Sequence, residues 1–221
     1  LGGGFARYAT DQKWLVPHFE KMLYDNALLS QMYAELYQIT KAEPYMHIIR
    51  KTLDYVIREM THPDGGLYSA QDADSEGEEG KFYLWKKNEI DSVIDDENVT
   101  NIFCEHYGVT QGGNFEGKNI LNVKLPILTL AKKYNKTPEQ IAQILRDASA
   151  KLFAAREERV KPGRDEKILT SWNGLMISGF ARGYAVSGDT KYLQAAKNAV
   201  NFIENKLASN DGRLKRTFKD G

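Results

Sequence analysis

Polar and aromatic side chains that could do chemistry gather in three stretches of the sequence. The first stretch, near the N-terminus, contains Arg7, Tyr8, Trp14, His18 and Glu20. The second follows a His-Pro-Asp-Gly-Gly turn and contains Tyr68, Asp72 and Asp74. The third contains Arg164, Asp165, Trp172 and Asn173. Ionisable groups of both signs beside aromatic rings are typical of ligand sites.

Two kinds of sugar chemistry fit these residue types. Hydrolysis of a glycoside needs two carboxyl groups, one as acid and one as base or nucleophile, and aromatic rings that stack on the sugar. The available acids are Glu20, Asp72, Asp74 and Asp165, and the available rings are those of Trp14, Tyr68 and Trp172. A sugar epimerase instead needs a base that takes a carbon-bound proton near neutral pH, for which His18 is the natural candidate.

We therefore treat His18, Glu20, Asp72 and Asp74 as candidate catalytic residues. The other polar and aromatic residues of the three stretches are candidates for substrate binding: Arg7, Tyr8, Trp14, Tyr68, Arg164, Asp165, Trp172 and Asn173. Two non-enzymatic functions stay open. The same groove could bind a glycan or peptide without converting it, or the region could be a scaffold that positions another domain.

The acidic run after Tyr68 resembles the start of a calcium loop but does not complete one. Asp72, Asp74 and Glu76 have the right spacing, yet the position of the bidentate glutamate is Tyr83, and a strand pattern follows. We expect no metal and no cofactor, and we interpret Glu76, Glu78 and Glu79 as a solvated loop.

Helical periodicity dominates the rest of the chain, so helices must position these residues. Apolar stripes, caps and breaks predict helices in pairs, over about 17–40, 45–60, 88–94, 98–107, 126–134, 137–156, 170–186 and 191–207. Alternating residues predict a β-hairpin with strands at 67–70 and 81–85, and a further short strand at 120–123. The first helix is predicted to start at Pro17, which places His18 and Glu20 in its first turn.

Glycine-bearing loops recur about every fifty residues, and each interval holds one helix pair. A helical hairpin cannot bury its apolar faces alone, so neighbouring hairpins must stack. The predicted fold is all-α: a helical-hairpin (α/α) toroid of the six-hairpin glycosidase-like type, incomplete because four hairpins are present. Residues 1–221 are then part of a single domain of a longer protein.

Loops that recur once per hairpin emerge on one side of such a ring. We therefore expect six residues to face one concavity: Arg7, His18, Asp72, Asp74, Arg164 and Trp172. Two arginines near two aspartates would keep those carboxylates ionised, and a helix N-terminus would favour neutral His18.

The amino-acid composition narrows the classes of molecule that could be partners. Thirty basic residues balance thirty acidic ones, so no charge excess favours nucleic acid or an anionic membrane. No apolar run approaches the length of a membrane span, and the single cysteine, Cys104, excludes an internal disulfide, which favours the cytoplasm. A small molecule, a glycan or a protein is the expected partner.

Long motifs carry a resemblance to a known family. The stretches 2–25, 68–75 and 164–175 resemble the spermatogenesis-associated protein 20 and YyaL family of thioredoxin-domain-containing proteins. The resemblance implies an N-terminal thioredoxin-like domain, followed by a helical region similar to the six-hairpin glycosidase and N-acylglucosamine 2-epimerase toroids. This chain has no C-x-x-C pair, so no redox activity is expected of it.

Overall fold

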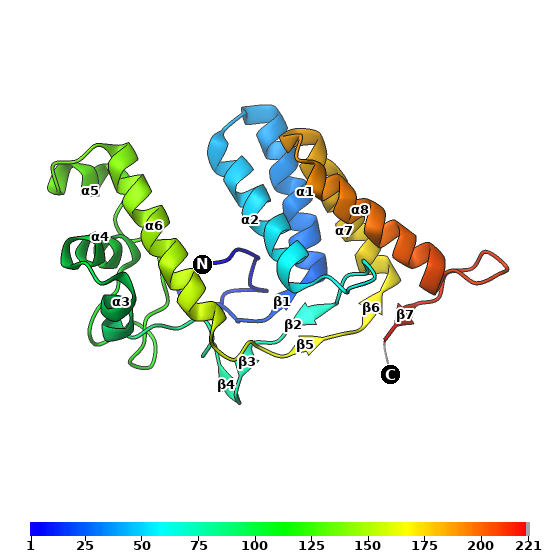
Figure 1. The fold of residues 1–221 in the computed structure, drawn as a ribbon, viewed down its shortest axis with the longest axis horizontal. Helices are drawn as coiled ribbons and strands as arrows, with labels where there is room; N and C mark the ends of the chain where they lie inside the picture. The colour runs from blue at the N-terminus through cyan, green and yellow to red at the C-terminus, as the bar shows by residue number, and fades with distance from the viewer. Residues whose placement is uncertain (220–221) are drawn as a thin grey trace. The chain divides into compact units, whose positions relative to one another are not determined.

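A computed structural model describes residues 1–219, which form two compact units (Figure 1). Unit 1 consists of Leu1, Ala9–Pro17 and Asp74–Pro162. Unit 2 consists of Gly2–Tyr8, His18–Ala73 and the chain from Gly163 onward. The last two residues of the predicted domain, 220 and 221, lie outside the described residues. The single toroidal domain stays a prediction.

Unit 2 is built from two helical hairpins. Helix α1 (Leu23–Thr40) pairs with α2 (Glu43–Glu59), and α7 (Thr170–Ser187) pairs with α8 (Thr190–Phe202), which continues as a π-helical turn over Ile203–Leu207. Figure 1 shows these four helices side by side, and α1 packs most extensively on α7.

Small residues allow α7 to approach both α1 and α2 closely. A Cβ atom at Gly179 would lie 2.6 Å from the Ser30 Oγ, and one at Gly183 would lie 2.2 Å from Leu53 Cδ1. The core around this contact is fully buried and includes Leu23 and Phe180. Burial of these apolar side chains stabilises the unit by roughly 2 kcal/mol for each large residue.

A three-stranded antiparallel sheet of unit 2 joins segments that are far apart in sequence. Its order is β1 (Lys21–Met22), β2 (Ala70–Gln71) and β5 (Arg164–Asp165), with Gln71 opposite both Lys21 and Arg164. Each strand directly adjoins or contains one of the three polar stretches of the sequence. A second antiparallel pair joins β6 (Ile168–Leu169) to β7 (Thr217–Phe218). Strand β6 directly precedes α7, and β7 is the last strand of the described chain.

Unit 1 contains two further helical pairs and one small hairpin. The helices are α3 (Lys87–Ile94), α4 (Glu97–Tyr107), α5 (Ile127–Lys133) and α6 (Pro138–Glu157), and the hairpin is β3 (Asp74–Ser75) with β4 (Glu78–Glu79). Their core is fully buried and contains Trp85, Phe103 and Leu152. The predicted cap of α6 is confirmed, because Thr137 and Gln140 bond each other's backbone N–H groups.

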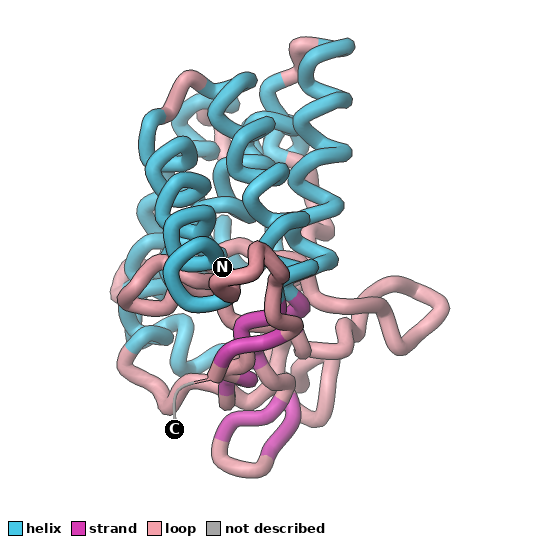
Figure 2. The backbone as a smooth tube through the Cα atoms, turned by 90° about the vertical axis from the view of Figure 1, so that its right-hand side faces the viewer, coloured by secondary structure: helices cyan, strands magenta, loops and turns pink. Residues whose placement is uncertain are grey.

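The predicted helical class is confirmed. Within residues 1–219 the chain forms eight α-helices in four consecutive pairs, and the strands between them are two residues long (Figure 2). No helix of this part of the chain combines the length and the apolar composition that crossing a membrane requires. Cys104 is buried, as its apolar neighbours indicate, and burial raises the pKa of its thiol to about 11.

The predicted start of the first helix at Pro17 is wrong. Residues 17–20 pair with the N-terminal segment instead: the His18 N–H donates to the Tyr8 carbonyl at 2.8 Å, and the Arg7 N–H donates to the Glu20 carbonyl at 2.9 Å. Helix α1 begins only at Leu23. Proline suits an extended segment as well as a first helical turn, and here the pairing decides.

The predicted β-hairpin is also misplaced. The hairpin lies inside the acidic loop, at Asp74–Glu79, and residues 81–83 form a turn. Arg156 explains the aromatic residues there, because its guanidinium lies 4.6 Å from the Phe82 ring and 5.5 Å from the Tyr83 ring. Residues 120–123 form no strand; Asn119 makes a single bridge with Trp85.

Candidate functional site

The sheet of unit 2 brings the three polar stretches together. His18 and Glu20 directly precede β1, Tyr68 and Asp72 flank β2, and Arg164 begins β5. The pairing continues beyond the strands, since the Asp72 N–H donates to the Gly163 carbonyl at 2.7 Å. Antiparallel pairing of Lys21 with Gln71 therefore sets Glu20 and Asp72 on adjoining strands.

A charged cluster stands before β1. The Arg7 guanidinium contacts Glu20 Oε2 at 3.0 Å, and His18 Nδ1 lies 3.8 Å from the same oxygen. The hydrogen bond with Glu20, and then the nearby Tyr24, raise the pKa of Arg7. The side chains of Arg7, His18 and Glu20 are 44, 28 and 24% exposed, so a ligand can reach them.

His18 keeps bonding capacity at its ring. Among residues 1–219 its Nδ1 finds no hydrogen-bond partner, although the atom is buried. The 3.8 Å separation from Glu20 Oε2 is too long for a direct hydrogen bond, so this nitrogen is unsatisfied within the described chain.

Aromatic rings stand on two sides of this cluster. Tyr8 stacks on His18 with ring centroids 4.9 Å apart, and Tyr8 is 51% exposed. Tyr24 meets Trp172 edge to face at 4.8 Å. The site therefore combines charged hydrogen-bonding groups with an accessible ring face.

Asp25 belongs to the cluster but is not among the predicted site residues. Burial raises the pKa of its carboxyl; the charge of Arg7 lowers it in part, and Glu20 raises it. Its Oδ2 is buried and has no hydrogen-bond partner in the described chain. The sequence signal existed, since Asp25 ends the same motif as His18 and Glu20, but a helix start at Pro17 would place it more than one helical turn along the axis from both.

Arg164 and Asp165 hold loops of unit 2 together. The Arg164 guanidinium lies 3.9 Å from the centre of the Tyr68 ring and contacts Glu166 at 3.0 Å. The Asp165 carboxylate contacts Lys167 at 3.1 Å. Burial opposes ionisation of Asp165, but bonds from Lys167 and Ser69 hold its pKa below the ordinary value.

Asn173 is a structural residue of unit 2. Its Oδ1 accepts from the Leu67 N–H at 2.8 Å, and its Nδ2 donates to the carbonyls of Leu67 and Leu169 at 2.9 and 3.0 Å. It is fully buried. Asp72, by contrast, is exposed, and its Oδ1 accepts only from the adjacent Ala73 N–H in the described chain.

Two expectations about charge are therefore wrong. The arginines contact glutamates, Arg7 with Glu20 and Arg164 with Glu166, instead of Asp72 and Asp74. His18 lies in an extended segment, so no helix N-terminus acts on it. Tertiary pairing of the N-terminal segment, which local sequence does not encode, explains the positions of Arg7 and His18.

Trp14 and Asp74 belong to unit 1, and the predicted convergence of all six residues stays a prediction. Trp14 is 84% exposed and has a left-handed backbone with φ of 54°. Asp11 holds its loop, since the carboxylate accepts from the N–H groups of Lys13, Leu15 and Val16. Asp74 is exposed on β3, opposite Glu79.

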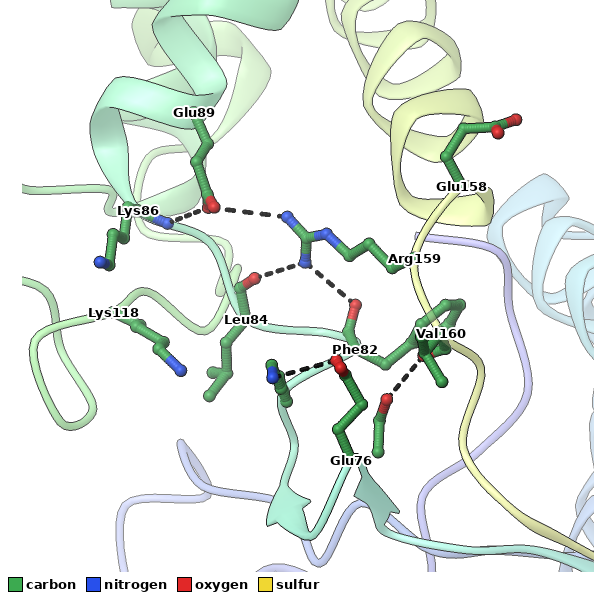
Figure 3. Close-up of a pocket in the computed structure, with 11 residues that line it drawn as sticks. Glu76, Phe82, Leu84, Lys86, Glu89, Lys118, Glu158, Arg159 and Val160 are labelled. Carbon is green, nitrogen blue, oxygen red and sulfur yellow. Dashed lines mark hydrogen bonds and ion pairs between the residues drawn. The ribbon is translucent and has the colours of Figure 1, made fainter.

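Unit 1 also contains a cavity of about 490 Å³ between α3, α6 and the acidic loop (Figure 3). Several of its charged groups have partners within the protein. Glu76 contacts Lys81 at 3.0 Å, Glu78 contacts Lys118, and Arg159 donates to the Leu84 carbonyl at 2.7 Å. These ion pairs agree with a solvated loop. No cluster of three or more His, Cys, Asp or Glu suited to a metal occurs in residues 1–219.

No protein-family model matches the chain. Spermatogenesis-associated protein 20 from Homo sapiens and from Rattus norvegicus is 37% identical over 246 aligned residues, which cover all of this chain. The chain matches one region of this family. It spans about a third of the curated relatives' length, 31% of the human and rat proteins. An uncharacterized protein of Caenorhabditis elegans is 31% identical over 98% of the chain and 33% of its own length.

Several solved structures of sugar enzymes are similar in fold to this chain. A D-mannose isomerase has a TM-score of 0.32 and 13% identity, over 98% of this chain and 49% of that one. A family 76 glycoside hydrolase from a bovine Bacteroides thetaiotaomicron strain has a TM-score of 0.29 and 15% identity, over 90% of this chain and 38% of that one. The cellobiose 2-epimerase of Spirochaeta thermophila has a TM-score of 0.25 and 15% identity, over 92% of this chain and 64% of that one. Likenesses at this level carry no argument about activity.

Proposed function

We propose that unit 2 binds a carbohydrate at the Arg7, His18 and Glu20 cluster and acts on it. The observation that carries the proposal is the Glu20 carboxylate, which Arg7 and His18 share beside the exposed face of Tyr8. Sugars present hydroxyl groups that donate to a carboxylate, and C–H faces that stack on aromatic rings. The family resemblance adds only a likeness in fold to sugar-enzyme toroids.

The proposal includes a wider architecture. The four helical hairpins would be part of a six-hairpin toroid, with further hairpins and a thioredoxin-like domain supplied by a longer cytoplasmic protein. Loops of the toroid would line the mouth that receives the sugar. Asp72 would then extend the site within unit 2, because it is exposed and adjoins the strand paired with β1.

A glycan and sugar screen of the full-length protein tests the binding step. For each sugar that binds, we expect the Glu20→Gln and His18→Ala variants to weaken binding about tenfold or more, because each removes a charged or polar contact worth ~1–3 kcal/mol. Tyr8→Ala should weaken it as well. Isothermal titration would give the affinities, and NMR of the sugar would detect any conversion.

Glu166→Gln is the matched control. Glu166 is an exposed carboxylate of the same unit that also contacts an arginine, so its loss should leave sugar binding unchanged. Equal binding by Glu20→Gln, His18→Ala and the wild type would reject the site. The arginine contacts would then act only as loop ties of a scaffold that accompanies the thioredoxin-like domain.

A further inference from the structure

We propose that unit 2 pairs with a second copy of itself through the exposed face that α1 and α7 share. This face is apolar, and it combines large side chains on one helix with small ones on the other. A two-fold axis places the large side chains of each copy on the small ones of its partner. The inference concerns association and does not depend on the carbohydrate site.

Both helices are apolar around most of their circumference. Helix α1 has two charged residues among its 18, Asp25 and Glu35, and α7 has one among its 18, Arg182. In α2, by contrast, six of 17 residues are Asp, Glu, Lys or Arg, as expected of a helix with one face in water. A helix that is apolar all round is typical of the interior of a protein. The outer face of α1 and α7 therefore has the composition of a covered surface.

A row of large apolar side chains lies along α1. Leu28, Met32 and Ile39 are 51, 44 and 80% exposed. Their spacing places them on one side of the helix, opposite the buried Leu23 and Ala27. Large apolar side chains that gather on one exposed face mark an interaction surface.

A row of small residues lies along the exposed side of α7. It consists of Gly174, Ser178, Ala181 and Ala185. A Cβ atom at Gly174 would meet no atom of the described chain within 4 Å. This row therefore leaves room for the larger side chains of a partner.

The two rows lie side by side. Tyr24 meets Trp172 with ring centroids 4.8 Å apart near the start of both helices, and Glu35 forms an ion pair with Arg182 farther along both. The helices therefore run parallel. The Glu35 and Arg182 side chains are 57 and 47% exposed, and they neutralise each other, so the face brings no unpaired charge into an interface.

A two-fold axis parallel to the helices matches the two rows. It lays α1 of one copy along α7 of the other, in the same direction and at nearly the same height. The rows have the same spacing, so one position suits every pair. Leu28, Met32 and Ile39 of one copy then meet Gly174, Ser178 and Ala185 of the partner copy. An axis across the helices would instead set large side chains against large ones.

The area of this face is sufficient for a specific dimer. Each helix has 18 residues and is therefore about 27 Å long. Neighbouring helices lie about 8–10 Å apart, so two of them present a face about 18 Å wide. Pairing of two such faces buries about 1,000 Å² in total, which is where specific interfaces begin.

Sedimentation of the full-length protein tests the association. The wild type should show a monomer–dimer equilibrium between about 1 and 100 µM, as an interface of this size allows. Met32→Glu should weaken the dimer about 30-fold or more, because it places an unpaired charge in an apolar contact. Met32 is exposed in the single copy, so the variant should melt like the wild type. The matched control is Val200→Glu, which changes an exposed apolar residue on α8 and should leave the dimer unchanged.

Disulfide formation between two different variants tests the register. A mixture of Met32→Cys and Ser178→Cys proteins should give a covalent dimer under mild oxidation, whereas neither variant should do so alone, because a disulfide needs Cα atoms within about 7 Å. A mixture of Leu28→Cys and Ala185→Cys proteins is the control and should stay monomeric on a denaturing gel, since these positions lie at opposite ends of the face. The native Cys104 is buried and does not compete.

Three results would overturn the inference. A monomer at about 100 µM would show that other parts of the longer chain cover this face or that it stays free, because an interface of this size should be populated there. A dimer that resists Met32→Glu would use another surface. A covalent dimer from the control mixture would exclude the parallel register.

Discussion

Trp14 has a backbone conformation that tryptophan rarely adopts. Its φ of 54° lies in the left-handed region, where a side chain costs about 1–2 kcal/mol. Its ring is 84% exposed, so the conformation is not compensated by burial. Strain of this kind is a reason to suspect a functional residue, and an exposed ring on a loop fixed by Asp11 suits sugar stacking.

The strain gives a stability prediction. Trp14→Gly should raise the free energy of unfolding by ~0.5–1 kcal/mol, because glycine adopts the left-handed conformation without a steric penalty. Urea denaturation measures the change. A loss of stability would contradict the strain.

Asp25 gives a prediction about pH. Burial raises its pKa above the ordinary 3.8, so the folded chain holds the proton more tightly than the unfolded chain. The resulting stability is complete below about pH 3.8 and is lost as the pH rises through the folded-state value. Asp25→Asn cannot ionise, so at neutral pH it should melt at a higher temperature than the wild type.

Calorimetry at about pH 7 and pH 3 measures this difference, which should vanish at the lower pH where both proteins are uncharged at this position. Asp211→Asn is the control. Its effect on the melting temperature at neutral pH should have the opposite sign. A hydrogen bond from Ser209 lowers the pKa of Asp211, so its loss should cost some stability at neutral pH and none at low pH. A lower melting temperature for Asp25→Asn at neutral pH would contradict the prediction.

For individual residues, the sequence predicts which side chains lie near one another but not which of them are in contact. His18 and Glu20 were placed near an arginine because their motif is dense in titratable groups, and the structure agrees. Asp25 was missed because its orientation depends on where α1 begins. That position is set by pairing with Arg7 and Tyr8, which no local pattern contains.

Helix α7 offers a matched pair of glycines. Alanine at Gly183 would place Cβ 2.2 Å from the buried Leu53 Cδ1, whereas Gly174 has no neighbouring atom within 4 Å in the described chain. Gly183→Ala should destabilise unit 2 by ~1–3 kcal/mol through overpacking. Gly174→Ala should stabilise it by ~0.5–1 kcal/mol, because alanine is the better helix former.

Thermal unfolding of the two variants, followed by circular dichroism, compares them under one condition. Equal effects would mean that α2 and α7 do not pack as closely as the Gly183 contact requires. The small residues of this helix therefore fall into two groups. Gly179 and Gly183 are buried and pack, whereas Gly174 and Ser178 are exposed.

Among elements, the helices could be predicted and the strands could not. Helical periodicity and caps, such as Thr137, are local signals that survive in the fold. The two-residue strands depend on partners far along the chain, as Gln71 does on Arg164. Phe82 and Tyr83 imitate a strand, but their rings pack on Arg156.

Residues 74–162 form an insertion in the sequence of unit 2, and the two ends of this insertion are paired. The chain leaves unit 2 after Ala73 and returns at Gly163, and the Asp72 N–H donates to the Gly163 carbonyl. Residues 74–162 should therefore be replaceable by an Asn-Gly turn, which closes antiparallel strands. The shortened chain should keep the helices of unit 2 and melt cooperatively.

Circular dichroism and tryptophan fluorescence of Trp172 would follow that unit. A matched deletion of α2 removes buried Leu53 and Val56 from the core and should abolish cooperative melting. Loss of folding in both deletions would show that unit 2 depends on unit 1.

The nested order of the chain has a consequence for its synthesis. A ribosome completes residues 74–162 before it makes α7, against which α1 packs. Unit 1 can begin to fold while the first half of unit 2 still lacks its partner. The face of α1 that carries Leu23 and Ala27 then stays uncovered until Met176 and Phe180 emerge. In the newly made chain, the first half of unit 2, with this face of α1 uncovered, is the segment that a chaperone should bind.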